Sequence, residues 1–452
     1  MIWLQFALLL GMILVGSNMK GIGLGVMGMV GMLVFVLVFH MKPADPPLDV
    51  MLIILSIVTT AATLQAAGGL DYLVGIAENL IRKNPAQITF VGPFVTYFLC
   101  LFAGTAHIAY SLMPIVAEVS AKKGIRPERP LSMTVVASHM ALTGSPMSAA
   151  TAALAALLAY PGAQANILMV CIPACIIGVA VGCFSVLKMG KELKDDPVYQ
   201  EHLQDPAFVA WLKGNEAKKE SEAKSTSASN EKAPLAVAIF GMAIMAIVLF
   251  GAFPQWVPNV GAGEANFSVD ANGNLKMGTL IEIITLSAAA AIMLLCKTTP
   301  AAVVKASLFN SMAAAVVSVF GVVWMSATFM AHNEPAIKAL LGDVVNAYPW
   351  SFTFAVFVMG VLMFSQAATT KTMMPLGLAL GISNPNLIAM FPAVNSDFVL
   401  PGYPTLLAAI NFDRTGSTSI GKYVINHSFM RGGVITIGVA CAVGFVLASV
   451  LL

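Results

Sequence analysis

A lysine and a run of hydroxyl side chains interrupt an apolar stretch near the C-terminal end of the chain. The polar run covers 365–375 (Ser-Gln-Ala-Ala-Thr-Thr-Lys-Thr-Met-Met-Pro), and the segments 350–364 and 376–380 around it are almost wholly apolar. A cation this deep in a bilayer costs about 2.5 to 3.5 kcal/mol on insertion scales. We therefore expect Lys371 to face protein, water or an anion rather than lipid.

The same layout occurs once earlier in the chain. Residues 104–114 (Gly-Thr-Ala-His-Ile-Ala-Tyr-Ser-Leu-Met-Pro) follow the apolar 94–103, and both polar runs end on Met-Pro at the same spacing. A second spacing also repeats, because Pro130 precedes Pro146 by as many residues as Pro385 precedes Pro401. These matches indicate two copies of one device.

Composition places the chain in a membrane. Of 452 residues, 58% are hydrophobic and 10% are charged, against about 25% charged in soluble domains. The net charge of +2 does not indicate nucleic acid as a partner. All six cysteines lie in apolar segments, which favours packed thiols over disulfides or a metal site.

The fold class we predict is an all-α polytopic membrane protein built from two repeats of inverted topology. The first repeat covers 1–187, a polar cytoplasmic linker with one or two short helices covers 188–234, and the second repeat covers 235–452. Each repeat contains a re-entrant helical hairpin and a discontinuous transmembrane helix. The hairpins are expected at about 86–119 and 350–381, and the broken helices at 131–158 and 387–410.

The hairpins are predicted to be re-entrant because the flanks of each polar tip are shorter than the roughly 20 residues that a span requires. Counting Lys and Arg puts 117–130, 188–234, 297–309 and 411–431 on the cytoplasmic side. It puts 159–163, 253–276 and 332–349 outside. This assignment inverts the second half relative to the first, and leaves the N-terminus and the C-terminus periplasmic.

Three further local predictions bear on packing. Gly21, Gly25 and Gly28 are expected to form a smooth stripe for close helix packing rather than a nucleotide site. The segments 70–83 and 332–348 are each expected to form a short amphipathic helix. In the first of these, Glu78 and Arg82 are spaced for a surface ion pair.

The polar tips and helix breaks together predict a binding site. A helix that begins inside the membrane presents unpaired N–H groups and about half a positive charge, which favours a small anion with more than one carboxylate. The candidate substrate-binding residues are Gly104, Thr105, His107, Thr143, Gly144, Ser145, Ser365, Gln366, Thr369, Thr370, Lys371, Asn395, Ser396 and Asp397.

Each candidate has a structural alternative. Hydroxyls in apolar helices often bond their own i−4 carbonyl. Asp397 either pairs with Lys371 or takes part in proton or sodium coupling. His139 could equally be packed in the core. No cofactor or metal is predicted, apart from H⁺ or Na⁺ as a coupling ion.

Several motifs of this chain resemble the Dcu family of anaerobic C4-dicarboxylate carriers over essentially the whole length. The motifs are Leu-Gln-Ala-Ala-Gly-Gly-Leu-Asp at 64–71, Phe-Ala-Gly-Thr-Ala-His at 102–107, Arg-Pro-Glu-Arg-Pro at 126–130, Ser-Gln-Ala-Ala-Thr-Thr-Lys at 365–371, Leu-Pro-Gly-Tyr-Pro-Thr at 400–405 and Phe-Asp-Arg-Thr-Gly at 412–416. Lys371 and the Asp-Asp-Pro-Val-Tyr segment at 195–199 make it resemble the DcuA branch. Ala106 departs from the family, where glycine is common at this tip.

The resemblance implies a secondary transporter that exchanges fumarate, malate, aspartate and succinate across the bacterial inner membrane by alternating access, in anaerobic respiration. It also implies that Glu78, Arg82 and Arg126 are transport-related charges. The alternatives are a proton- or sodium-coupled symporter and a receptor that signals through 188–234 to a sensor-kinase partner. No enzyme motif is present, and a homo-oligomer is left open, as is contact with membrane lipids.

Overall fold

The computed structural model describes residues 1–19, 22–46, 48–158, 160, 162–212, 231–261, 266, 268–270, 272–363, 365–400, 403–421 and 426–452. Within these ranges the chain is helical, and its only β contacts are isolated bridges such as Asn259 with Asn274. The all-α fold class is confirmed. The inverted relation of the two halves stays a prediction.

The α-helices of the first half precede the short helices of the polar linker. They are α1 (Ile2–Met19), α2 (Gly23–Leu37), α3 (Leu48–Ala66), α4 (Gly69–Lys83), α5 (Ile88–Ala103), α6 (Ala109–Lys123), α7 (Glu128–Met140), α8 (Ala149–Leu158) and α9 (Ala163–Val186). The linker holds α10 (Pro197–His202) and α11 (Pro206–Leu212). The predicted end of the linker, 213–230, lies outside the described residues.

The second half begins at α13. Its α-helices are α13 (Ala233–Ala252), α14 (Met277–Cys296), α15 (Pro300–Lys305), α16 (Ser307–Ala347), α17 (Phe352–Met363), α18 (Gln366–Ala379), α19 (Asn384–Met390), α20 (Pro404–Phe412) and α21 (Met430–Leu451). Short 3₁₀ helices fill several junctions. Those that matter below are Ala106–Ile108, Ala141–Thr143 and the eight-residue stretch Phe391–Phe398.

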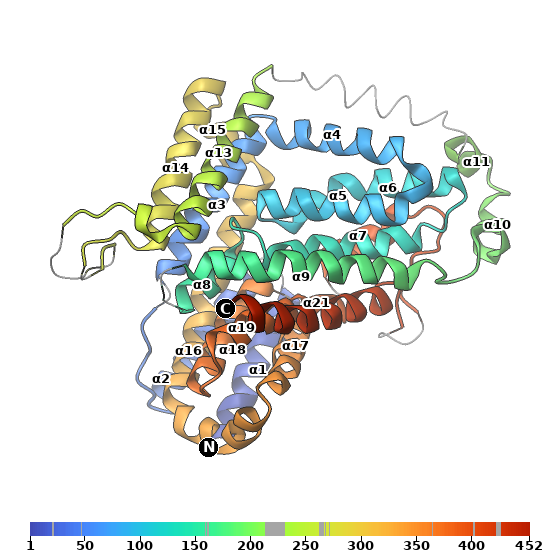
Figure 1. The fold of residues 1–452 in the computed structure, drawn as a ribbon. Coiled ribbons are helices and arrows are strands. Elements are labelled where there is room, and N and C mark those ends of the chain that lie inside the picture. The colour runs from blue at the N-terminus through green and yellow to red at the C-terminus, as the bar shows by residue number, and fades with distance from the viewer. Residues whose placement is uncertain are drawn as a thin grey trace.

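Two sets of helices cross in Figure 1. One set runs side by side across the picture and consists of α4, α5, α7, α9 and α21. The other set crosses it at a steep angle and includes α1, α2 and α16. Among the described residues, five helices are long and apolar enough to cross a membrane, or six if α3 and α4, bent by 71° at Gly68, form one span. The chain is thus a multi-pass membrane protein.

Glycines allow the closest helix crossing. A Cβ on Gly321 of α16 would lie 1.8 Å from the carbonyl oxygen of Gly25 in α2, and one on Gly28 would lie 2.5 Å from the carbonyl carbon of Gly321. The predicted role of Gly25 and Gly28 in close packing is therefore confirmed. Gly21 lies outside the described residues.

The polar interruptions in the sequence coincide with helix ends. Helices α5 and α6 lie on either side of Gly104 in the sequence and pack together. Helices α17 and α18 lie on either side of Ser365 and also pack together. The segment 131–158 divides into α7 and α8, and 387–410 divides into α19, a 3₁₀ stretch and α20. That both helix pairs are re-entrant stays a prediction.

Two local expectations differ from the structure. The segment 332–348 is not a separate helix, because α16 continues through Pro335 to Ala347. The first arm of the first pair is also longer than expected, since Pro85–Ala103 forms 19 continuous residues, enough to cross. Length alone therefore does not make this arm re-entrant.

Candidate functional site

Both polar tips begin their second arm with a hydroxyl cap. Helix α5 ends at Gly104, whose φ of +69° favours glycine, and the extended Thr105 then accepts the N–H of His107 at 3.2 Å. Ser365 is also extended and accepts the N–H of Ala368 at 3.3 Å. The repeated sequence device thus produces the same local structure twice.

Each break packs against the first arm of the helix pair that precedes it. Ser145 donates to the carbonyl of Leu101 at 2.6 Å, and Ser396 donates to the carbonyl of Phe357 at 2.5 Å. A glycine permits the close approach each time: a Cβ on Gly104 would lie 2.3 Å from the carbonyl oxygen of Met147. A Cβ on Gly360 would lie 2.2 Å from Oγ of Ser396.

The two breaks meet each other across the halves. Asn395 Nδ2 donates to Thr143 Oγ1 at 3.3 Å and to the carbonyl of Pro392 at 3.0 Å. Its Oδ1 is buried without a hydrogen-bond partner among the described residues. The structure therefore joins Thr143 of the first break to Asn395 of the second, and leaves one buried acceptor of Asn395 unsatisfied.

A buried chain of hydrogen bonds lies beside this junction. His139 Nδ1 is 2.9 Å from Asp397 Oδ1, and His139 Nε2 is 2.8 Å from Thr405 Oγ1. Gln366 Nε2 donates to the second carboxylate oxygen, Oδ2 of Asp397, at 2.9 Å. His139 is 1% exposed and Asp397 is 0% exposed. His139 is in the core, but as a partner of a carboxylate rather than as packing.

Lys371 has a different environment. Its side chain is 4% exposed, and within the described part of the chain its Nζ has no hydrogen-bond partner. The alternative that it pairs with Asp397 is wrong, because the carboxylate bonds His139 and Gln366 instead. Burying a charged ammonium without a partner costs free energy, so this amine is a candidate for binding an anion.

The remaining predicted residues make contacts within their own helix or tip, or with a neighbouring helix. Thr369 and Thr370 donate to the carbonyls of Ser365 and Gln366, the i−4 pattern of structural hydroxyls. Gly144 lies against Ile172, where a Cβ would be 2.8 Å from Cγ1. His107 is exposed, and its Nδ1 is 2.8 Å from Thr105 Oγ1.

Arg82 and Glu78 form the predicted ion pair, away from the breaks. Arg82 bonds Glu78 at 2.8 Å and, across to α6, Glu118 at 2.9 Å. Glu118 also pairs with Lys122. These charges attach α4 to the second arm of the first helix pair.

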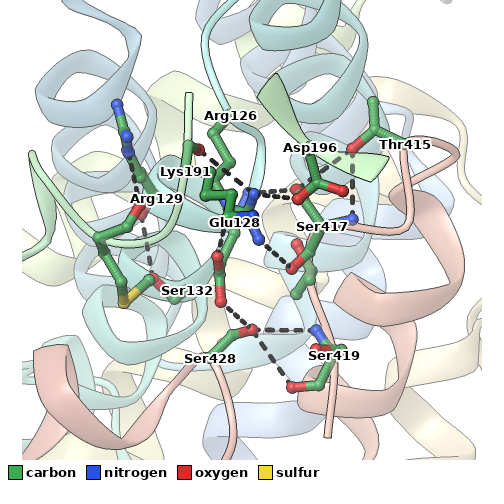
Figure 2. A network of polar contacts seen from close by, with 12 residues as sticks. Arg126, Glu128, Arg129, Ser132, Lys191, Asp196, Thr415, Ser417, Ser419 and Ser428 are labelled. Atoms are coloured by element: carbon green, nitrogen blue, oxygen red, sulfur yellow. Dashed lines mark hydrogen bonds and ion pairs between the residues drawn. The ribbon is translucent and has the colours of Figure 1, made fainter. Parts of the chain in front are cut away.

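Arg126 is the centre of a separate network that joins both halves and the linker. Figure 2 shows it between Glu128, at 2.5 Å, and Asp196. Its guanidinium also donates to the carbonyl of Ser417 at 3.5 Å. Glu128 in turn accepts from Ser428 at 2.7 Å. Partial burial alone would raise the pKa of Asp196, but the bond to Arg126 outweighs it and holds that pKa below its usual value.

Sequence reasoning missed several partners because they are distant along the chain. His139 and Asp397 are 258 residues apart, and Arg126 and Asp196 are 70 apart. The local signals were a histidine in an apolar helix, His139, and an arginine in the turn before α7, Arg126. No local pattern indicated Thr405 or Ser428.

The full length of the chain is similar to known membrane transporters. A family described as "Anaerobic c4-dicarboxylate membrane transporter" matches residues 1–452. The chain is 38% identical to the C4-dicarboxylate transporter DcuA of Wolinella succinogenes, with 100% of both covered. It is 36% identical to the anaerobic C4-dicarboxylate transporter DcuB of Escherichia coli O6:H1, covering 99% of this chain and 98% of that one.

One solved structure indicates the fold. MtrF of Neisseria gonorrhoeae, described with a class of antimetabolite efflux pumps, aligns with a TM-score of 0.50 at 11% identity. The alignment covers 93% of this chain and 84% of that chain. This likeness is one of fold alone.

Proposed function

This chain belongs to the family of anaerobic C4-dicarboxylate membrane transporters, and from that membership we propose that it exchanges fumarate, malate, aspartate and succinate by alternating access. The exchange takes place across the bacterial inner membrane, with both chain termini on the periplasmic side. The family consists of transporters, not enzymes. The observation that most supports binding of a carboxylate is the buried, unpartnered amine of Lys371.

Lys371 binds one carboxylate of the substrate in this proposal. A charged hydrogen bond to an anion would satisfy an ammonium that no described residue satisfies. Lys371 lies five residues after Gln366, which is about 7.5 Å along α18. Lys371 therefore lies within two turns of the helix start that Ser365 caps, where backbone N–H groups favour the second carboxylate.

The two breaks close the site on the opposite side. The contact between Asn395 and Thr143 connects the first half to the second at one point. The unsatisfied Oδ1 of Asn395 would accept from a hydroxyl or ammonium of malate or aspartate. Movement of one half against the other would break this contact and expose the site alternately to the two sides.

Counterflow in proteoliposomes tests the proposal. Purified protein is reconstituted with unlabelled succinate inside, and uptake of labelled fumarate from outside is measured. We expect uptake to require internal dicarboxylate, because the exchange of two dianions moves no net charge. Uptake that is equally fast into liposomes loaded with a monocarboxylate would overturn exchange.

The alternative is a symporter coupled to protons or sodium. The buried pair of His139 and Asp397 favours it, because such pairs in transporters often carry protons. Empty liposomes distinguish the two. An imposed proton or sodium gradient would drive fumarate into them if the protein were a symporter, and would not if it were an obligate exchanger.

A further inference from the structure

The hydrogen bonds that link Gln366, Asp397, His139 and Thr405 take no part in the carboxylate binding proposed above. We propose that His139 binds one proton together with a C4-dicarboxylate dianion and releases it when the singly charged aspartate is bound. The proposal rests on the exchange function. It assigns to this buried imidazole the task of keeping the charge of the loaded carrier constant.

The geometry identifies the atom that gains the proton. Oδ2 of Asp397 accepts a hydrogen bond from Gln366, and Oδ1 lies 2.9 Å from Nδ1 of His139. A hydrogen on Nδ1 therefore gives each carboxylate oxygen of Asp397 a donor. The tautomer is thereby fixed, and Nε2 is the nitrogen left to titrate. The carboxylate then stabilises the imidazolium that forms.

Thr405 can serve both states of the ring. A hydroxyl both donates and accepts. Across the 2.8 Å contact it donates to Nε2 when the imidazole is neutral, and accepts from Nε2–H when the imidazole is charged. Protonation therefore requires only that one hydroxyl rotate, and leaves no atom of this contact unsatisfied.

Other titratable groups lie on the elements that pack against α7. Tyr403 lies 4.7 Å from the His139 ring between centroids, and the exposed His107 belongs to the 3₁₀ turn Ala106–Ile108, which contacts α7. Helices α5, α9 and α21 contribute a buried tyrosine, Tyr97, and buried thiols. Tyr110 of α6 adjoins His107, with ring centroids 6.0 Å apart.

The charged groups on these helices lie at the far end of α7. Glu128 is eleven residues from His139, about 16 Å along the helix, and Arg431 of α21 lines a surface cavity with Glu128. Glu118, at the end of α6, is held by Arg82 and Lys122. Asp397 is thus the one carboxylate bonded to the imidazole among the described residues.

Charge balance gives the pair its function. Fumarate carries two negative charges, and aspartate, with its ammonium, carries one. Fumarate bound with an imidazolium and aspartate bound with a neutral imidazole give the loaded site the same total charge. Inward movement of fumarate with one proton against outward movement of aspartate then transfers no net charge. An uncompensated charge in the membrane interior would instead oppose one of the two directions.

The test compares two substrates in one preparation. Full-length protein in liposomes that contain a pH-sensitive dye exchanges external fumarate for internal aspartate or internal succinate. We expect about one proton to enter per fumarate with aspartate inside, and none with succinate inside. We also expect the apparent KM for fumarate to rise with pH by up to about tenfold per pH unit, and that for aspartate to stay flat, because one proton binds with fumarate and none with aspartate.

His139→Gln removes the titration but keeps an amide that can bond Asp397 and Thr405. In this variant, proton entry and the pH dependence of the fumarate KM should vanish, while exchange of aspartate for aspartate continues. His332→Gln is the matched control, because His332 is exposed on α16 and outside this network. Thr405→Val removes only the partner of Nε2, and should displace the pH at which the fumarate KM rises.

The outcomes separate the inference from the proposed function. If the wild-type protein exchanges fumarate for aspartate without proton entry, the role of His139 is wrong and exchange stands. The same holds if His139→Gln keeps the wild-type pH dependence. If His139→Gln does not fold, an unchanged pH profile in Thr405→Val overturns the role. Absence of any exchange in the wild-type protein removes both proposals.

Discussion

The two polar tips have the same cap but different charge and burial. Thr105 caps a short 3₁₀ turn, Ala106–Ile108, and the side chain that follows, His107, is exposed. Ser365 caps α18 directly, and the charged side chain that follows, Lys371, is buried. The two tips therefore share the capping chemistry, while the formal charge lies at one tip only.

The two helix breaks also differ in charge, and again the charged residue belongs to the second half. The second break carries Asp397, whereas the first break carries no charged residue between Thr143 and Ser148. The first half adds His139 from α7. Both fixed charges of the candidate site thus belong to the second half, and the first half supplies groups that are neutral or can titrate. Substitutions in the second half should therefore affect substrate affinity most.

Lys371→Met should have the largest effect on transport. Loss of a charged hydrogen bond of about 1.5–3 kcal/mol raises the KM for fumarate about ten- to hundredfold. The variant should melt no lower than the wild-type protein, because it removes a buried ammonium that has no partner. Uptake kinetics and thermal unfolding in detergent measure the two effects.

His107→Met is the matched substitution at the first tip, and should change the KM far less because His107 is exposed. An equal change of the KM for fumarate in both variants would contradict the proposal that the second tip determines substrate affinity. A lower melting temperature for Lys371→Met would make the lysine structural.

Gly104→Ala should destabilise the protein more than Gly360→Ala. At Gly104 the φ of +69° alone costs about 1–2 kcal/mol for alanine, and the new Cβ meets the backbone of Met147. At Gly360 the Cβ meets the side chain of Ser396, which can rotate at the cost of a hydrogen bond of about 1 kcal/mol. Comparison of the two unfolding midpoints checks the order, and the reverse order would contradict it.

Thr143→Val with Ser145→Ala removes the polar contacts of the first break. The change loses the bonds to Asn395 and to Leu101, about 2 kcal/mol in total, and should slow transport. Ser396→Ala loses the single bond to Phe357 and should cost about half as much. Transport rates and unfolding midpoints of both variants measure this. Unchanged kinetics in the double variant would place the first break outside the site.

The sequence predicted the local features of the site better than its connections. Proline, glycine and hydroxyl residues locate the breaks and the caps because they act on the backbone within a few residues. Polarity misled at 332–348, where α16 continues through Pro335. Packing against other helices can hold such a segment helical when its own sequence disfavours it.

Pairings across the two halves could not be predicted for a different reason. His139 and Asp397 meet only because α7 and the second break pack together, and nothing near either residue specifies its partner. Arg126 reaches both Asp196 of the linker and Ser417 of the second half in the same way. A single sequence contains propensity and periodicity but not these tertiary distances.

Asp196→Asn should have the smallest effect, and tests the second connection between the halves, at Arg126. The pKa of Asp196 is lowered in the folded protein, so its contribution is complete above its usual pKa of about 3.9 and is lost as the pH falls through the lower value. We expect the variant to be less stable by at most about 1 kcal/mol at neutral pH.

This difference should shrink as the pH falls below the usual pKa of an aspartate, about 3.9, because the wild-type carboxyl itself becomes neutral. Thermal unfolding of both proteins between about pH 3 and pH 7 measures it. A difference that persists at the acid end would mean that the aspartate does not act through its charge on Arg126. The cap of α10 does not depend on that charge, because a neutral asparagine or carboxyl can still accept the N–H of Val198. The comparison would then lose Asp196 of the linker as a charged partner of Arg126, and the halves would be connected through contacts such as those of His139 and Asn395.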